Sequence, residues 1–535
     1  MKAWLNECME CHDKCVAPTK AFWPTRLLDL KHSQGSRNLA LVDGRHSSDE
    51  KASYVTPSHC WGPLPRRTAT TSKANLAERR DSIGLDELPL TYRDAVEITR
   101  SLGIRYLWID SLCIIQDQPD DWETEVTLMG QVYAQSICTL IASSSDSPDR
   151  GCRVNAQART PYEPRNDARP RKAEENNLPV DLKIGARRIR FFKNSPLDWN
   201  NEWDQGPLRQ RAWTLQEREL SLRSIHFSKN LLLWECQSAK ASSELPWMQM
   251  KIEDPLPSFL LNEIAELRHE TELMRLRERW FKIIEDFSSR NLTFELDKLP
   301  ALSGLVQESM KMHGSYYAGL WEKDMPSALL WRTRNEIYVP EKKLPRRPSQ
   351  YRAPTWSWAS VEGDVTYESQ MLDHGGARDS SRKADCDFGK FQVRGTAEGQ
   401  NISGAVSEGN ICLSGSLKVA TLNTNVPEVT GSPHHRGWNA LSKVDGATIG
   451  AIYIDVLSEL GHGQAIFCLG VRNERYWSMI SLPDEVYGRG PEPEDDEESR
   501  ALIMGLALLD DEKHPGAYRR VGLVRLDEAI VLLGH

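Results

Sequence analysis

Residues 104–115, IRYLWIDSLCII, are almost continuously apolar, and this run constrains the fold more than any other part of the sequence. A strand has this composition when both of its faces are covered, as happens in a parallel sheet with helices on either side. The run therefore predicts a buried strand that ends at Asp110. A later β-branched segment, ICTLIAS at residues 137–143, predicts a second buried strand.

Helical patterns alternate with these two strands. The segment LPLTYRDAVEITRSLG has apolar residues at helical spacing, a capping pattern formed by Thr91 and Asp94, and Gly103 at its end. A second helical pattern starts after Pro119 and runs through DWETEVTLMGQVYAQ. Alternation of helix and strand is typical of βαβ units, so the sequence predicts an α/β fold with a parallel sheet.

The length of 535 residues exceeds what one hydrophobic core usually organises. We expect an N-terminal helix over 1–19, an α/β domain over 20–240, a helical segment over 241–350 and a β-rich C-terminal region over 351–535. Within the α/β domain, core motifs over 54–150 and 207–237 flank a linker over 155–182 that is rich in charge, Pro and Asn.

Composition excludes several classes of protein. A formal net charge of -9 argues against a dedicated nucleic-acid surface, which needs clustered Lys and Arg. The N-terminus has no signal-peptide pattern, and no segment offers the roughly 18 apolar residues of a membrane helix. An odd number of cysteines, eleven, favours reduced thiols over a disulfide framework. We therefore expect a cytoplasmic protein without a membrane span.

Three motifs occur in order along the α/β domain. They are YVTPSHCWG at residues 54–62, LWIDSLCIIQD at 107–117 with DWETEVTLMGQVY downstream, and RAWTLQE at 211–217. Together they resemble the fungal heterokaryon incompatibility (HET) family, and the segments WLNECMECHDKC and RAPTWSWASVEG resemble flanks seen in such proteins. Pro57 departs from the family pattern, where Leu is more usual.

This resemblance implies a TIR-like, parallel-sheet HET domain, followed by the helical segment and the β-rich region. It implies a role in nonself recognition that ends in programmed cell death, with other incompatibility proteins or self-association as partners. Some TIR domains cleave NAD with a glutamate, so NAD is a candidate substrate, and no cofactor is expected. A noncatalytic signalling module and a diverged enzyme of secondary metabolism are the alternatives.

Glu125 is the first candidate catalytic residue. In the helix after Pro119 it shares a face with Trp122 and Met129, so its carboxylate is expected to be desolvated, whereas Glu123 points elsewhere. It also follows a buried strand, where α/β sheets place their ligands. The alternative is a structural ion pair with an arginine such as Arg211.

The ends of the first two strands supply the other candidates. Asp110 is the second candidate catalytic residue, and a ribose or another polar substrate is expected at this edge of the sheet. The expected substrate-binding residues are Ser58, Trp61, Gln116, Asp117 and Arg211. A loop cap explains Asp117 equally well. A nucleophile built from Ser58, His59 or Cys60 is disfavoured, because neighbouring strand residues point to opposite faces. Packing and internal salt bridges are the favoured roles of Arg211 and Glu217.

The N-terminal cysteines match metal-ligand spacing. Cys8, Cys11, His12 and Cys15 include a C-x-x-C-H pattern. At helical spacing they form a single stripe on one helix and would not surround an ion. We therefore expect thiols packed into the core and no metal site.

Overall fold

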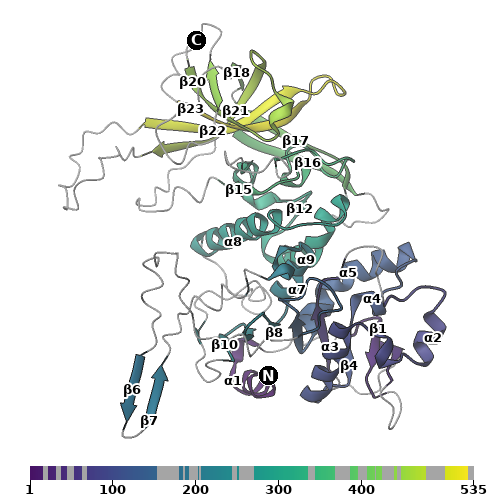
Figure 1. Ribbon diagram of the computed structural model, residues 1–535. Helices are drawn as coiled ribbons and strands as arrows, with labels where there is room; N and C mark the ends of the chain where they lie inside the picture. Colours follow the sequence, from purple (N-terminus) through teal and green to yellow (C-terminus); the bar gives the residue numbers. More distant parts are fainter. Residues whose placement is uncertain are drawn as a thin grey trace, which may run out of the picture. The chain divides into compact units, whose positions relative to one another are not determined.

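The structure is a computed structural model, and Figure 1 shows its elements. It describes residues 1–15, 22–31, 38–44, 53–62, 69–152, 180–184, 187–191, 203, 206–243, 250–251, 270–334, 344–367, 386–395, 406–415, 417–423, 439–442, 448–476 and 500–527. The chain divides into two compact units. Unit 1 contains Met1–Glu266 and Ser303–Glu308, and unit 2 contains Leu267–Leu302 and Ser309–His535.

Unit 1 is built on a nine-stranded mixed sheet. In spatial order its strands are β11 (Met250–Lys251), β10 (Ala239–Ser242), β9 (Leu232–Cys236), β8 (Arg223–Phe227), β5 (Cys138–Ile141), β3 (Tyr54–Ser58), β4 (Tyr106–Leu107), β1 (Arg26–Asp29) and β2 (Ala40–Asp43). The four central strands, β8, β5, β3 and β4, are parallel. The predicted α/β fold with parallel strands is confirmed, and antiparallel strands extend the sheet at both edges.

The apolar run at residues 104–115 is buried as predicted, but only part of it is a strand. β4 is short, and the helix α4 (Asp110–Cys113) begins at the residue where the predicted strand ended. Trp108, Ile109 and Leu112 are fully buried, so the run is apolar because the helical turn is covered as completely as the strand. Burial alone does not distinguish the two conformations in a short apolar run.

The helix α3 (Leu90–Leu102) precedes β4 and ends at Gly103, whose φ of 88° is the left-handed conformation that glycine adopts most easily. The predicted N-cap at Thr91 is wrong, because the N-cap is Pro89, two residues earlier, and Thr91 lies inside the helix. The Thr91 hydroxyl instead accepts a hydrogen bond from the Gly151 amide, and the Asp94 carboxylate accepts one from the Cys152 amide. These side chains anchor a distant loop to the helix.

Two further helices of unit 1 carry the other motifs. α5 (Pro119–Gln135) starts at the predicted proline, which is favoured in a first turn because its missing N–H has no partner there. α7 (Trp213–Glu219) follows a 3-10 turn over Pro207–Gln210, so Arg211 precedes the helix and Glu217 lies within it. The predicted linker over 155–182 lies outside the described residues except for its last three, which belong to β6 (Val180–Ile184).

The N-terminal helix α1 (Lys2–Cys11) lies beside β8 (Figure 1). The predicted single stripe through Cys15 is wrong. His12 leaves the helix with φ -106° and ψ 96°, and a 3-10 turn over Asp13–Cys15 follows. Cys8 and Cys15 are buried, as predicted, whereas Cys11 is exposed.

Unit 2 begins with the helix α8 (Glu270–Ser288) and includes the last residues of α9 (Ser303–His313). Unit 2 also contains three two-stranded sheets. They are formed by β12 (Tyr316–Tyr317) with β13 (Leu320–Trp321), β14 (Trp331–Thr333) with β15 (Val365–Tyr367), and β16 (Cys386–Gly395) with β17 (Val406–Gly415). Aromatic rings fill the core. Trp321, Trp331 and Trp358 are each at most 1% exposed, and the Trp358 indole donates to the Gly319 carbonyl at 2.8 Å. The Trp-rich motif near residue 356 is therefore part of this core.

The β-rich C-terminal region is confirmed as a closed six-stranded barrel. Its strands are β18 (Leu417–Asn423), β19 (Asn439–Ser442), β20 (Thr448–Ile454), β23 (Tyr518–Asp527), β22 (Arg500–Asp510) and β21 (Ala465–Tyr476). The fully buried Arg520 pairs with Asp455 at 3.0 Å and donates to the carbonyls of Leu329 and Trp331. This arginine links the barrel to the aromatic core within unit 2.

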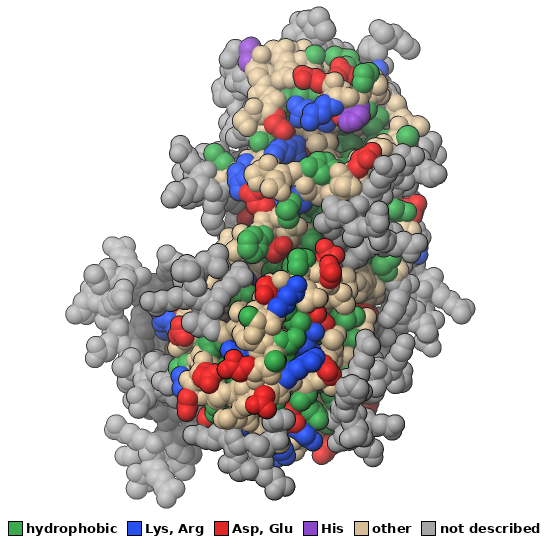
Figure 2. Space-filling view, turned by 90° about the vertical axis from the view of Figure 1, so that its right-hand side faces the viewer, with side chains coloured by type: hydrophobic (Ala, Val, Ile, Leu, Met, Phe, Trp, Pro, Cys, Tyr) green, Lys and Arg blue, Asp and Glu red, His purple; other side chains and the backbone are tan. Residues whose placement is uncertain are grey.

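No helix among the described residues combines the length and apolar character needed to cross a bilayer. On the face shown in Figure 2, acidic and basic side chains lie side by side among hydrophobic ones and are not separated by sign.

Candidate functional site at the carboxyl ends of the parallel strands

Polar side chains meet where β3 and β4 end, because the carboxyl ends of parallel strands share one edge of the sheet. We call this group the strand-end cluster. Its members are Ser58, His59, Trp61, Tyr92, Asp110, Ser111 and Glu217. It combines carboxylate, imidazole, hydroxyl and indole groups, which suits binding of a polar ligand.

Ser58 is the last residue of β3, and its hydroxyl donates a hydrogen bond to Oε2 of Glu217 on α7. The Ser58 and Glu217 side chains are both buried. A hydrogen bond to a charged group contributes about 1.5–3 kcal/mol, more than one between neutral groups. This bond therefore fixes α7 against the end of the central strand.

His59 contacts different partners from Ser58, as the alternation of side chains along a strand requires. Its Nε2 lies 2.8 Å from the hydroxyl of Tyr92 on α3, and that hydroxyl lies 2.8 Å from the hydroxyl of Ser111. Burial lowers the pKa of His59, the Asp110 carboxylate opposes this shift, and Arg211 adds to it. The imidazole is therefore neutral at neutral pH and can either donate or accept a proton.

Asp110 links the two strand ends. Its Oδ2 accepts a hydrogen bond of 2.7 Å from the indole N–H of Trp61, and its Oδ1 accepts one of 2.7 Å from the Ser111 amide. Oδ1 also lies 3.8 Å from Nε2 of His59. The Asp110 side chain is 15% exposed, against 2% for His59, so this carboxylate can reach a ligand that the imidazole cannot contact directly.

The carboxylates of Asp110 and Glu217 and the guanidinium of Arg211 determine the electrostatic field in the strand-end cluster. The negative charges of Glu217 and Asp110 add to burial in raising the pKa of Tyr133, so both carboxylates lie within electrostatic range of that phenol. Burial also raises the pKa of Cys60, while a hydrogen bond and the positive charge of Arg211 oppose the shift. A raised pKa keeps the Cys60 thiol protonated, which argues against a nucleophilic role.

Glu125 belongs to a different group of charges. It is 1% exposed on α5, and its Oε1 lies 3.5 Å from Nη2 of Arg26 on β1. Burial raises the pKa of Glu125, a hydrogen bond from Thr25 and the charge of Arg26 oppose this, and Asp121 adds to it. The desolvation expected from the sequence is present. The arginine beside it is Arg26, whereas the charge of Arg211 acts on Cys60 and His59.

Gln116 and Asp117 make local contacts. The Gln116 side-chain amide donates to the carbonyls of Asp110 and Ile114 at 3.2 and 3.1 Å. Asp117 is exposed and accepts a hydrogen bond from the Lys73 amide, which is the loop-capping role left open by the sequence.

The structure thus brings Ser58, Trp61 and Asp110 together and places Glu125 elsewhere. Sequence reasoning did not assign His59, Tyr92, Ser111 or Glu217 to the site. Glu217 closes the third motif and is buried in a short helix, and a carboxylate there needs a partner. The sequence could therefore have identified Glu217 as a residue with a buried polar partner, but no feature of the sequence identified Ser58 as that partner.

No curated protein and no solved structure matches the chain. The model of the family described as "Heterokaryon incompatibility protein (HET)" matches residues 54–217, which begin at β3 and end at Glu217. The matched region therefore contains every member of the strand-end cluster. Residues 54–217 of this chain are a heterokaryon incompatibility (HET) domain.

Proposed function

We propose that this chain acts in heterokaryon incompatibility in the fungal cytoplasm, and that its HET domain promotes cell death by hydrolysing NAD at the strand-end cluster. The observation that carries the enzymatic part is the position of Asp110. This partly exposed carboxylate lies at the carboxyl ends of parallel strands, and two hydrogen bonds hold its oxygens in place.

In the proposed reaction water replaces nicotinamide at the anomeric carbon of the ribose. The carbon–nitrogen bond breaks and nicotinamide leaves as a neutral molecule with the bonding electrons. The oxygen of water forms the new bond to the anomeric carbon, and ADP-ribose and one proton are the other products. The positive charge that develops on the ribose needs a carboxylate nearby, as in glycoside hydrolysis. Asp110 supplies that charge, and Trp61 and Ser111 orient it. Arg211 supplies a positive charge suited to the pyrophosphate.

The rival proposal is a noncatalytic signalling module that kills by recruiting partners. The hydrogen bonds inside the cluster favour it, because Ser58 is paired with Glu217 and His59 with Tyr92. Side chains that satisfy one another also stabilise a domain without any reaction. The two proposals differ in what happens to cellular NAD.

The test is expression of the full chain in a fungal host, with cell death and NAD measured together. We expect NAD to fall before death. Asp110→Asn should abolish both effects and lower the rate of nicotinamide release by a factor of about 100 or more. Asp86→Asn, which changes an exposed acid of the same domain, is the control and should leave both effects intact. Cell death with undiminished NAD would reject hydrolysis and support recruitment.

A further inference from the structure

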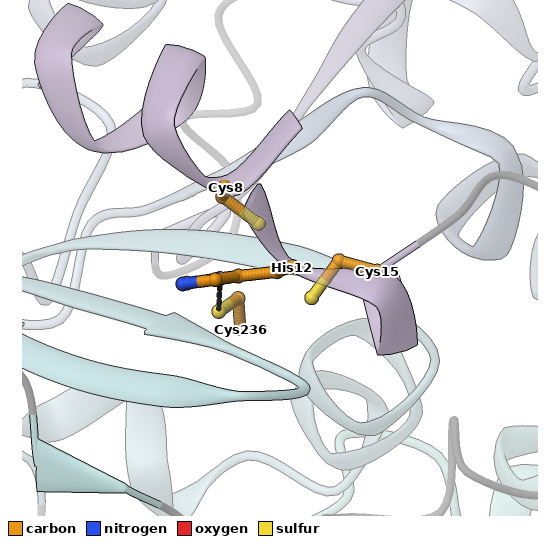
Figure 3. A group of neighbouring side chains, drawn as sticks. All are labelled: Cys8, His12, Cys15 and Cys236. Carbon is orange, nitrogen blue, oxygen red and sulfur yellow. Dashed lines mark hydrogen bonds between the residues drawn. The ribbon is translucent and has the colours of Figure 1, made fainter. Parts of the chain in front are cut away.

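The N-terminal segment and β9 bring four metal-binding side chains together. Sγ of Cys8, Cys15 and Cys236 and a ring nitrogen of His12 all lie within 4.8 Å of one another. Figure 3 shows Cys8 at the end of α1, His12 and Cys15 on the turn that follows, and Cys236 on the strand, with the four side chains converging. Nδ1 of His12 lies 3.3 Å from Sγ of Cys236.

The break in the helix makes this arrangement possible. A continuous helix would project Cys8, His12 and Cys15 from one side of a rod. Because α1 ends at Cys11 and a 3-10 turn follows, Sγ of Cys15 lies within 4.8 Å of Sγ of Cys8. The three thiols are at most 3% exposed, and β9 supplies the fourth ligand from more than 200 positions along the chain.

We propose that Cys8, His12, Cys15 and Cys236 bind one structural zinc ion. Three thiolates and one imidazole are a common ligand set for tetrahedral zinc, and four protein ligands leave no open position for catalysis. Zn–S bonds of about 2.3 Å place tetrahedral sulfur ligands roughly 3.8 Å apart, so these atoms need only a small contraction to bind the ion. Cys11, which completes the C-x-x-C-H pattern in the sequence, is exposed and does not belong to the group.

A buried arginine is an independent observation that favours a bound metal. Arg223 at the start of β8 is 5% exposed, its Nε lies 3.2 Å from Sγ of Cys8, and its Nη2 donates to the Cys15 carbonyl at 2.5 Å. Within the described part of the chain, no carboxylate pairs with this guanidinium. A buried charge needs a counter-charge. Zinc with three thiolates and a neutral imidazole carries one negative charge, which Arg223 neutralises as a second layer around the ligands.

The proposed ion ties the N-terminal segment to the sheet that carries the HET domain. Sγ of Cys15 lies within 4.8 Å of Sγ of Cys8 and of Cys236, and 3.7 Å from the Ser238 hydroxyl. Without a metal, these weak contacts hold the turn to the strand. With zinc, four strong bonds join them, and the site becomes a cross-link whose removal loosens α1.

Metal content of the full chain tests the proposal directly. Protein purified with a thiol reductant and without chelator should contain about one zinc ion per chain. After zinc removal and anaerobic addition of Co²⁺, it should show the absorption bands of tetrahedral, thiolate-bound cobalt. Protein that contains no zinc and shows no such bands with Co²⁺ overturns the proposal. A disulfide between two of these cysteines, found after thiols are blocked at lysis, also overturns it.

Variants identify the ligands. Cys8→Ser and Cys236→Ser should each lose the zinc, and the thermal unfolding midpoint should fall. Cys11→Ser is the matched control, because it removes a thiol three residues from Cys8 and should keep the metal. His12→Cys should also keep it, because a fourth thiolate replaces the imidazole, whereas His12→Ala should lose it. Retention of stoichiometric zinc in both Cys8→Ser and Cys236→Ser would contradict the assignment even if the wild type contains zinc.

Discussion

Glu125→Gln distinguishes a structural carboxylate from a catalytic one. Arg26, the cation beside Glu125, is already well paired. Its Nη2 lies 2.8 and 2.6 Å from the two carboxylate oxygens of Asp121, and its Nε donates to the Cys113 carbonyl at 2.6 Å. The contact with Glu125 is longer, at 3.5 Å, and Oε2 of Glu125 has no hydrogen-bond partner among the described residues. When the negative charge of Glu125 is removed, the Asp121 carboxylate therefore still neutralises Arg26.

The expected change in the free energy of unfolding follows from these contacts. Breaking a buried ion pair costs about 3–5 kcal/mol when the partner charge is left alone, which is not the case for Arg26. Glutamine loses part of a hydrogen bond, worth about 1 kcal/mol, and avoids the cost of burying a carboxylate. We expect Glu125→Gln to be within about 1 kcal/mol of the wild type at pH 7.

The pH dependence has a definite sign. Burial raises the pKa of Glu125 above its ordinary value of 4.5, so the folded state holds this proton more tightly than the unfolded state. The wild type is therefore most stable, relative to Glu125→Gln, below pH 4.5, and it loses that advantage as the pH rises through the folded pKa. Glutamine does not titrate, so the free energy of unfolding of Glu125→Gln lacks this pH-dependent contribution.

Urea unfolding of the full chain at pH 5 and pH 7, with cell death measured in the fungal host, tests the account. Glu123→Gln is the control, since this exposed neighbour on α5 should change neither measurement. Arg26→Met should cost about 3–5 kcal/mol, because it leaves two carboxylates without their cation. A loss above 3 kcal/mol in Glu125→Gln would refute the reasoning about Arg26. A stable Glu125→Gln protein that no longer kills would place Glu125 in the chemistry.

Two further substitutions test packing. Arg520→Met should destabilise the full chain by about 3–5 kcal/mol in urea unfolding, because it leaves the buried carboxylate of Asp455 without its cation. An unchanged unfolding midpoint would contradict the role of this ion pair. Gly130→Ala on α5 should cost about 1–3 kcal/mol despite the helix preference of alanine, because its Cβ would lie 2.6 Å from the Cα of Gly304. Gly461→Ala, where a Cβ meets no atom within 4 Å, is the control, and equal losses in the two variants would refute the steric argument.

Several local features of unit 1 can be predicted from the amino-acid sequence. The apolar run at residues 104–115 predicted burial, Gly103 predicted the end of α3, and Pro119 predicted the start of α5. Each of these signals lies within a few residues of the element it specifies. Backbone conformation and amphipathic period are local properties, so one stretch of chain is enough to reveal them.

Which side chains contact one another depends on the three-dimensional fold. Ser58 and Glu217 are 159 positions apart, and Arg26 reaches α5 from β1, a strand between β4 and β2 whose place in the sheet no periodicity predicts. The N-terminal cysteines show the same limit, because a one-residue departure from the helix at His12 turned an apparent stripe into a converging group. Contacts between distant residues depend on strand order and on where each helix stops. A pattern of residue types does not encode these three-dimensional relations, because many arrangements of the same elements bury the same apolar faces.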